Sequence, residues 1–232
     1  MITLTAVSKH FGQIHERRPG PEGRAVAVQD ISLTLAEGSI TVIQGPSGSG
    51  KTTLLRLIAG LERPSAGEIR IDGEIASTPT WVLPPCQRDI GFVFQDPALW
   101  PHLTVAQNIG FGLLGHPKQE IARRVDEIMT GMDLASLQGR YPNQLSGGQA
   151  RRVAIARTLV VNPRCLLLDE PLTHLHPELK DQILAMIRDQ IAARSITLLY
   201  VTHNVDEAAY WEGRRLRMVG GRLEEKAVSK RS

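Results

Sequence analysis

The sequence predicts an α/β fold built on a mainly parallel β-sheet. A glycine-rich loop at residues 45–52 lies between an apolar strand that starts at Ile40 and a helix expected over residues 51–59. A strand–loop–helix unit of this kind is typical of parallel sheets. Two more apolar runs, at residues 165–168 and 196–201, are typical of strands that are buried on both faces.

The remaining segments complete the expected architecture. Residues 2–7 and 31–35 alternate in polarity as short strands do, and the polar segment 16–24 between them predicts an exposed hairpin extension. Between residues 95 and 161 the apolar side chains recur with helical spacing, which predicts a helical lobe inserted into the α/β core. The expected helices of this lobe lie around residues 105–114, 117–132 and 147–160.

The composition favours one domain and disfavours a nucleic-acid partner. The chain has 232 residues, a mass of 25.5 kDa, a formal net charge of +3 and a sequence pI of about 9.1, which suits a single domain that carries a lobe. Aromatic residues make up only 4% of the chain and do not alternate with basic ones, so we expect no nucleic-acid binding. The basic tail at Lys226, Lys230 and Arg231 is interpreted as solvated.

No segment of the sequence predicts membrane insertion or a disulfide framework. No run approaches the roughly 20 apolar residues that cross a bilayer, and the first residues lack a secretion signal. We therefore expect a cytoplasmic chain. Cys86 and Cys165 show no metal-ligand spacing, and Cys165, which lies in an apolar strand, is expected to be a small buried hydrophobic residue.

The glycine-rich loop has the phosphate-binding pattern G-x-x-x-x-G-K-[ST]. Glycines in this pattern let backbone N–H groups curve around phosphate oxygens, while Lys51 reaches the β and γ oxygens and the Thr52 hydroxyl ligates magnesium. The pattern alone indicates a nucleoside triphosphate and nothing more specific. Its residues are Gly45, Pro46, Ser47, Gly48, Ser49, Gly50, Lys51 and Thr52.

A second phosphate-handling segment, Leu145-Ser146-Gly147-Gly148-Gln149, begins the helix expected at residues 147–160. Its two glycines stand where free N–H groups and the positive end of the helix dipole favour an anion. With both segments in this order, the chain resembles the ATPases of ATP-binding cassette transporters. The resemblance extends from Ile2 to about Leu223.

This resemblance implies a P-loop NTPase core with a mainly parallel sheet, an N-terminal antiparallel β subdomain and an inserted α-helical subdomain. It implies a single cassette domain over residues 1–232. The core would occupy about residues 1–94 and 162–232, and the helical signature subdomain about residues 95–161.

The resemblance also implies roles for individual residues. Asp169 holds magnesium through water, and Glu170 is the general base that accepts a proton from the attacking water. Gln95 reaches magnesium and that water, and His203 hydrogen-bonds the γ-phosphate. Phe11 stacks on adenine, with an ordinary core or hairpin aromatic as its alternative. The implied ATP-binding residues are Phe11, Gly45, Pro46, Ser47, Gly48, Ser49, Gly50, Lys51, Thr52, Thr53, Ser146, Gly147, Gly148 and Gln149, and the implied magnesium ligands are Thr52, Gln95 and Asp169.

The chain departs from the family pattern in two places. After Pro171 most members read Ser-Ala-Leu-Asp, whereas this chain reads Thr173-His174-Leu175-His176. The missing aspartate would lie at a dimer interface, so the coupling between two sites is in doubt; a metal site at the two histidines lacks an evident third ligand. Ala150 stands where a basic or polar side chain is commoner, and the arginines that follow it at 151, 152 and 157 are interpreted as solvated helix charges.

The function implied is the ATP-hydrolysing subunit of a bacterial solute importer, with ATP and Mg²⁺ as cofactors. Two subunits, in a homodimer or a heterodimer, would pack head to tail, with each ATP between Lys51 of one chain and Ser146 and Gly148 of the other. The dimer would drive transmembrane permease subunits, served by a substrate-binding protein, from the inner face of the membrane.

A groove for a permease helix is implied at residues 95–105, where Leu99 and Trp100 would be exposed; Trp100 as a cap on the core of the lobe is the alternative. The competing functions are an exporter ATPase, a soluble cassette ATPase outside transport, and a regulatory subunit that hydrolyses ATP poorly. Intact Glu170 and His203 argue against the last of these. The transported solute is not encoded in this chain.

Overall fold

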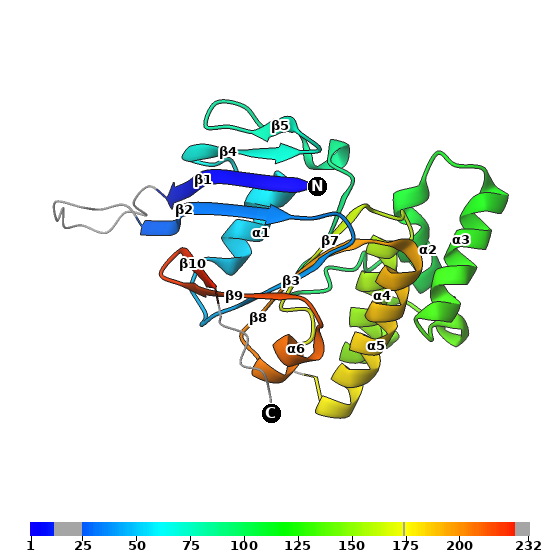
Figure 1. Ribbon diagram of the computed structural model, residues 1–232. Coiled ribbons are helices and arrows are strands. Elements are labelled where there is room, and N and C mark those ends of the chain that lie inside the picture. The colour runs from blue at the N-terminus through cyan, green and yellow to red at the C-terminus, as the bar shows by residue number, and fades with distance from the viewer. Residues whose placement is uncertain (12–24, 174, 226–232) are drawn as a thin grey trace, which may run out of the picture. The chain divides into compact units, whose positions relative to one another are not determined.

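The computed structural model describes residues 1–11, 25–173 and 175–225 (Figure 1). The expected extension at residues 16–24, His174 and the basic tail lie outside these ranges. The chain forms two compact units, Met1–Ile90 with Leu199–Ser232, and Gly91–Leu198. This partition differs from the expected division at residues 94 and 161, which stays a prediction.

The first unit contains an antiparallel sheet with the strand order β2-β1-β4-β5. In β1, Ile2 is paired with Leu35 on one side and with Ile71 on the other. Strand β1 continues beyond Val7, where the sequence predicted its end. Irregularities in its pairing, one of them next to Ala6 at φ 51°, interrupt the alternation of buried and exposed residues from which the strand was predicted. The strands are β1 (Ile2–Phe11), β2 (Ala25–Leu35), β4 (Ala66–Ile71) and β5 (Glu74–Ser77).

A second layer of the first unit carries the glycine-rich loop. Its strand order is β10-β9-β3-β8, in which β3 and β9 are parallel and β9 and β10 antiparallel. Helix α1 has the predicted bounds, and its leucines are fully buried. The elements are β3 (Ile40–Gln44), α1 (Lys51–Ala59), η1 (Pro85–Gln87), β8 (Thr197–Thr202), α6 (Val205–Tyr210), β9 (Arg214–Val219) and β10 (Arg222–Glu225).

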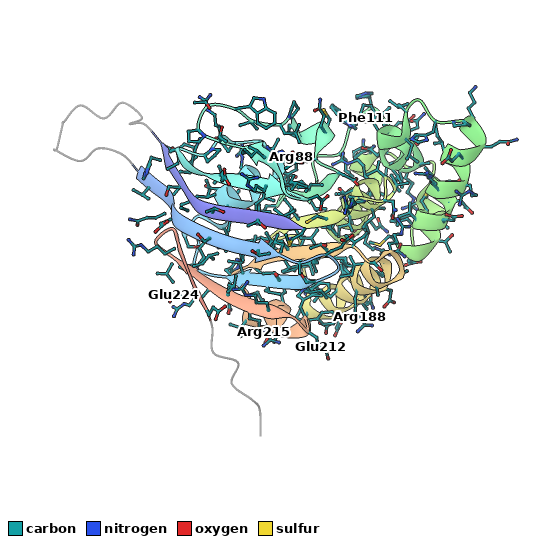
Figure 2. The ribbon with its side chains drawn as sticks, turned by 45° about the horizontal axis from the view of Figure 1, so that its top comes forward. Arg88, Phe111, Arg188, Glu212, Arg215 and Glu224 are labelled. Carbon is teal, nitrogen blue, oxygen red and sulfur yellow. The ribbon has the colours of Figure 1, made fainter. Side chains whose placement is uncertain are left out.

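The C-terminus of α1 is held by the guanidinium of Arg88, a side chain that is only 3% exposed (Figure 2). It donates to the carbonyl oxygens of Leu57 and Ile58, the last turn of the helix, at 3.4 and 2.8 Å. It also donates to the carbonyls of Leu83 and Ala76 and to the Ser77 hydroxyl, at 2.9, 2.7 and 2.6 Å. Burial lowers the pKa of Arg88 to about 10. The helix that begins at the glycine-rich loop is thus fixed at its far end by one buried cation.

The second unit contains the helical region. Strand β7 lies beside β6 and has all five residues buried. Helix α4 packs against α2, α3 and α5, and α4 and α5 lie side by side (Figure 1). The elements are β6 (Ile90–Val93), α2 (Val105–Gly110), η2 (Phe111–Leu113), α3 (Lys118–Gly131), η3 (Ala135–Leu137), η4 (Pro142–Gln144), α4 (Gly147–Leu159), β7 (Cys165–Asp169) and α5 (Pro177–Arg194).

The expected α/β fold is therefore confirmed, with an antiparallel β layer, parallel pairing beside the glycine-rich loop and a helical region. The expected helix at residues 105–114 is an α-helix only to Gly110 and continues as a 3₁₀ turn, where Gly110 and Gly112 weaken helical propensity. In the described part of the chain, no helix is long and apolar enough to span a membrane.

The two cysteines should differ sharply in reactivity. Cys86 is exposed, whereas Cys165 is buried in β7, as its sequence context predicted, and burial raises the pKa of its thiol to about 12. Because the thiolate is the reactive form, Cys165 should be inert in the folded protein. We expect a chromogenic disulfide reagent at pH 8 to modify one thiol per native chain and two in urea. Rapid modification of both native thiols would contradict this burial.

Candidate functional site

The glycine-rich loop has a backbone that other residues could not adopt. A Cβ atom at Gly45 would collide with the carbonyl oxygen of Met218, and one at Gly50 with that of Ala27. Gly48 and Gly50 also have positive φ angles of 77° and 105°, a region in which glycine is unstrained. At Gly48 a Cβ atom would meet no atom within 4 Å, so this part of the loop faces open space.

Lys51, the first residue of α1, is only 3% exposed and folds back onto this loop. Its ammonium donates to the carbonyl oxygens of Gly45 and Pro46, both at 2.9 Å. The Ser49 hydroxyl is buried and has no hydrogen-bond partner among the described residues. Such an orphaned donor is unfavourable unless a ligand satisfies it, so the loop fits an oxygen-rich group such as a phosphate. Thr52 is exposed and Thr53 half-buried in the same helical turn.

The turn that carries His203 lies next to the loop. The N–H of Gly45 donates to the carbonyl oxygen of Thr202, the last residue of β8, at 3.3 Å. His203 follows and is exposed. Phe11 ends β1, is 39% exposed, and has the Lys9 ammonium 5.1 Å from its ring centroid. The first unit therefore contains the loop, His203 and Phe11.

The acidic pair lies in the second unit, where β7 ends. Asp169 is the last residue of the strand and is 3% exposed. Glu170 has a φ of 46°, in the left-handed region, which costs a residue other than glycine about 1–2 kcal/mol. The Thr173 hydroxyl donates to the Glu170 carbonyl oxygen at 2.7 Å and fixes this turn.

Helix α4 begins with a capping box. Ser146 is the N-cap: its hydroxyl accepts from the Gln149 N–H at 3.3 Å, and its own N–H donates to Gln149 Oε1 at 2.9 Å. A Cβ atom at Gly147 would meet nothing within 4 Å, whereas one at Gly148 would collide with the Leu179 side chain of α5. Gly147 thus leaves the helix end open, while a side chain at Gly148 would displace the end of Leu179, a contact that the sequence did not indicate.

The interpretation of the α4 arginines as solvated charges is wrong. Arg151 donates to the Gln95 carbonyl oxygen, and Arg157 donates to those of Pro97 and Ala98 at 3.0 and 2.9 Å. Burial lowers the pKa of both guanidinium groups. The third, Arg152, donates to Asp133 and to the Met132 carbonyl oxygen. Helix α4 therefore holds the main chain that follows Gln95.

The predicted site residues fall into two groups. Gln95, the segment at residues 146–149, Asp169 and Glu170 lie in the second unit, and the others in the first. The proposed magnesium ligands are a hydroxyl, an amide and a carboxylate, and oxygen donors of this kind suit Mg²⁺. Among the described residues no group of three His, Cys, Asp or Glu side chains could hold a metal ion.

His176 occupies the N-cap of α5 without making a side-chain cap hydrogen bond. Aspartate is among the best N-cap residues, and its charge also favours the positive end of the helix. We therefore expect His176→Asp to raise the free energy of unfolding by about 1 kcal/mol, measured by urea denaturation at pH 7.5. The matched variant His176→Ala, which supplies no cap, should leave stability within about 0.5 kcal/mol of the starting protein. Equal stability of the Asp and Ala variants would contradict the capping argument.

Three comparisons relate this geometry to known proteins. The family model described as ABC transporter matches residues 28–173. The chain is similar to the Fe(3+) ions import ATP-binding protein FbpC of Photorhabdus laumondii, with 46% identity over 89% of this chain and 55% of the relative. It is also similar to the sulfate/thiosulfate import ATP-binding protein CysA of Gloeobacter violaceus, with 44% identity over 97% of this chain and 61% of the relative. The chain thus spans little more than half the length of these relatives.

Among solved structures, the fold matches the dimeric post-hydrolysis state of the ATP-binding cassette MJ0796 bound to ADP and Pi. The TM-score is 0.83 at 33% identity, over 97% of this chain and 98% of the other. The dimeric structure of MJ0796 as a bacterial ABC transporter cassette matches with the same values.

Proposed function

Because the chain belongs to the ABC transporter family, we propose that it is the ATP-binding and ATP-hydrolysing subunit of a bacterial importer. The observation that carries this proposal is the glycine-rich loop, with its buried Lys51 and a Ser49 hydroxyl that has no hydrogen-bond partner in the described part of the chain. The similar proteins named as import ATP-binding proteins favour import over the exporter alternative. Because their names give different solutes, we assign none to this chain.

In the proposed reaction the protein positions water and donors around a phosphoryl group whose transition state spreads charge over its oxygens. The loop N–H groups and the Lys51 ammonium bind the phosphates, and the His203 imidazole donates to the γ-phosphate. Glu170 accepts a proton from the attacking water, which Gln95 orients. Magnesium, held by Thr52, Asp169 and Gln95, would neutralise charge on the phosphate oxygens when bound.

We place each ATP between two copies of the chain. The open N-terminus of α4, with Ser146 as its cap and Gly147 exposed, can approach a γ-phosphate bound by Lys51 of the other copy. The solved relative MJ0796 is dimeric. Hydrolysis would remove the nucleotide contact that favours the closed dimer, so ATP biases a two-state switch.

The switch would act on a permease through an apolar groove in the second unit. This groove shares only His102 and Leu103 with the expected segment 95–105, where Trp100 is exposed but Leu99, contrary to expectation, is half-buried. This cavity of about 580 Å³ lies along α2 and α3, and Phe111 and Leu114 beside it are 44% and 69% exposed. Trp100, 44% exposed, packs on Phe111 with ring centroids 5.5 Å apart. Clustered exposed apolar side chains suit docking, and an amphipathic permease helix fits a groove of this kind. The subunit would then lie on the inner face of the membrane.

The groove is tested by co-purification with the transmembrane subunits of the same transporter. Leu114→Glu should reduce their recovery with this chain at least about tenfold, because it places a charge in the apolar contact. Leu61→Glu, at a leucine that is 40% exposed in the first unit, is the matched control and should not reduce recovery. Equal recovery with both variants would exclude the groove as the docking site.

The ATPase proposal is tested by phosphate release from the purified chain. We expect continuous hydrolysis of ATP that stops when EDTA removes magnesium and resumes when magnesium is restored. ATP binding without turnover, either alone or with the permease subunits, would instead support a regulatory subunit that pairs with another ATPase.

A further inference from the structure

A buried carboxylate lies beside the turn that carries His203. Glu207, in the first turn of α6, is only 5% exposed. Its Oε2 atom accepts hydrogen bonds from the Tyr200 hydroxyl and the Thr202 hydroxyl, both at 2.9 Å. A carboxylate is stable in the protein interior only when hydrogen bonds replace its lost hydration. Two hydroxyl donors from β8 therefore fix the position of this side chain.

The Thr202 hydroxyl connects this carboxylate to the main chain around His203. It donates a hydrogen bond to the Glu207 carboxylate and accepts one from the Asn204 N–H at 3.0 Å. The Asn204 side chain in turn accepts from the N–H groups of Asp206 and Glu207, at 2.8 and 3.1 Å. These bonds enclose residues 202–207 in one network, with His203 between its two fixed neighbours.

The C-terminal end of helix α6 is also held by hydrogen bonds, which restricts movement of the helix that carries the Glu207 carboxylate. Arg215 donates to the carbonyl oxygens of Ala209 and Trp211 at 3.1 and 3.3 Å (Figure 2). Trp211 is 1% exposed, and its ring packs against that of Tyr200 with centroids 5.5 Å apart. The helix that carries Glu207 is therefore anchored in the protein interior by these contacts.

The C-terminal end of β8 contacts the glycine-rich loop, because the Thr202 carbonyl oxygen accepts from the Gly45 N–H. We propose that Glu207, acting through the Thr202 hydroxyl, is a positioning residue that sets the direction of the His203 imidazole relative to this loop. The inference rests on the proposed function, which gives His203 its role at the γ-phosphate. Glu207 itself touches neither nucleotide nor water in this mechanism.

The network offers variants that separate positioning from stability. Glu207→Gln and Thr202→Val should each lower kcat about tenfold and leave KM for ATP within about twofold, because misdirected catalytic groups lose rate more than binding. Thr202→Ser keeps the hydroxyl and should restore kcat to within about twofold. Tyr200→Phe removes the other donor to the same carboxylate but keeps the bonds of the Thr202 hydroxyl to Glu207 and Asn204, so it should lower thermal stability and change kcat by less than about twofold.

A double-mutant cycle identifies the residue through which the effect passes. In a His203→Ala background, Thr202→Val should lower kcat by less than about twofold further. A full tenfold loss in that background, or an equal loss of kcat in Tyr200→Phe, would overturn the proposal.

A second readout does not depend on hydrolysis. In protein with isotope-labelled histidine, the His203 ring resonances, identified by their loss in His203→Ala, should shift in Glu207→Gln and stay in place in Tyr200→Phe. Unchanged His203 resonances in Glu207→Gln would overturn the inference. Failure of the starting protein to hydrolyse ATP would overturn the proposed function instead, and the resonances would still decide the role of Glu207.

Discussion

Replacement of Lys51 by alanine is expected to lower the rate of ATP hydrolysis at least about a hundredfold. The ammonium is the buried cation of the loop, and it is 2.9 Å from the carbonyl oxygens of Gly45 and Pro46. Its loss removes a positive charge from the proposed phosphate site and two hydrogen bonds from the loop backbone. Loss of one preorganised electrostatic contact to a transition state costs about 10²–10³ in rate.

Phosphate release and calorimetric ATP titration measure this effect. Arg188→Ala, which removes an exposed cation from α5 (Figure 2), is the control for a change in net charge and should leave the rate unchanged. A Lys51→Ala rate within about tenfold of the starting protein would show that ATP is not processed at this loop.

Replacement of Arg88 by methionine is expected to destabilise the first unit by about 3 kcal/mol or more. Methionine fills much of the same volume but leaves the carbonyl oxygens of Ile58, Leu83 and Ala76 and the Ser77 hydroxyl without their donor. Each buried polar group left unsatisfied costs about 1–3 kcal/mol, and partial relaxation reduces the sum. Arg88→Lys should not rescue stability, because an ammonium cannot reach these acceptors as a planar fork does.

Urea denaturation measures the difference, with Arg217→Met as the control at an exposed arginine of β9. The control should lie within about 0.5 kcal/mol of the starting protein, and an equal effect of both variants would contradict the account. Burial lowers the pKa of Arg88 to about 10, so the side chain stays charged at and well above neutral pH. The stability that it contributes should therefore not vary with pH near neutrality.

The sequence predicted best those features that local chemistry determines. Helix α1 was predicted at both ends, because the glycine-rich loop fixes its start and Gly60, at φ 77°, its end. The buried strands were found by their apolar runs. Strand β1 was predicted too short, because an irregularity in its pairing near Ala6 is set by its partners in the sheet.

The roles of long polar side chains could not be predicted from the sequence. In the sequence, Arg157 and Arg88 look like ordinary exposed charges. Only the folded structure shows that each donates to main-chain carbonyl oxygens distant in sequence. The contact of Gly148 with the Leu179 side chain of a later helix is likewise not indicated by the sequence. Pairings of this kind depend on tertiary contacts, which period and motif do not encode.

The central claim is that ATP completes a site shared by two copies of the chain. The most direct test is the mass of the Glu170→Gln variant by light scattering, with and without ATP and magnesium, because blocked hydrolysis should trap the closed state. We predict a shift from the mass of one chain, 25.5 kDa, to twice that mass when ATP and magnesium are added. A mass that stays at one chain while calorimetry shows bound ATP would contradict it.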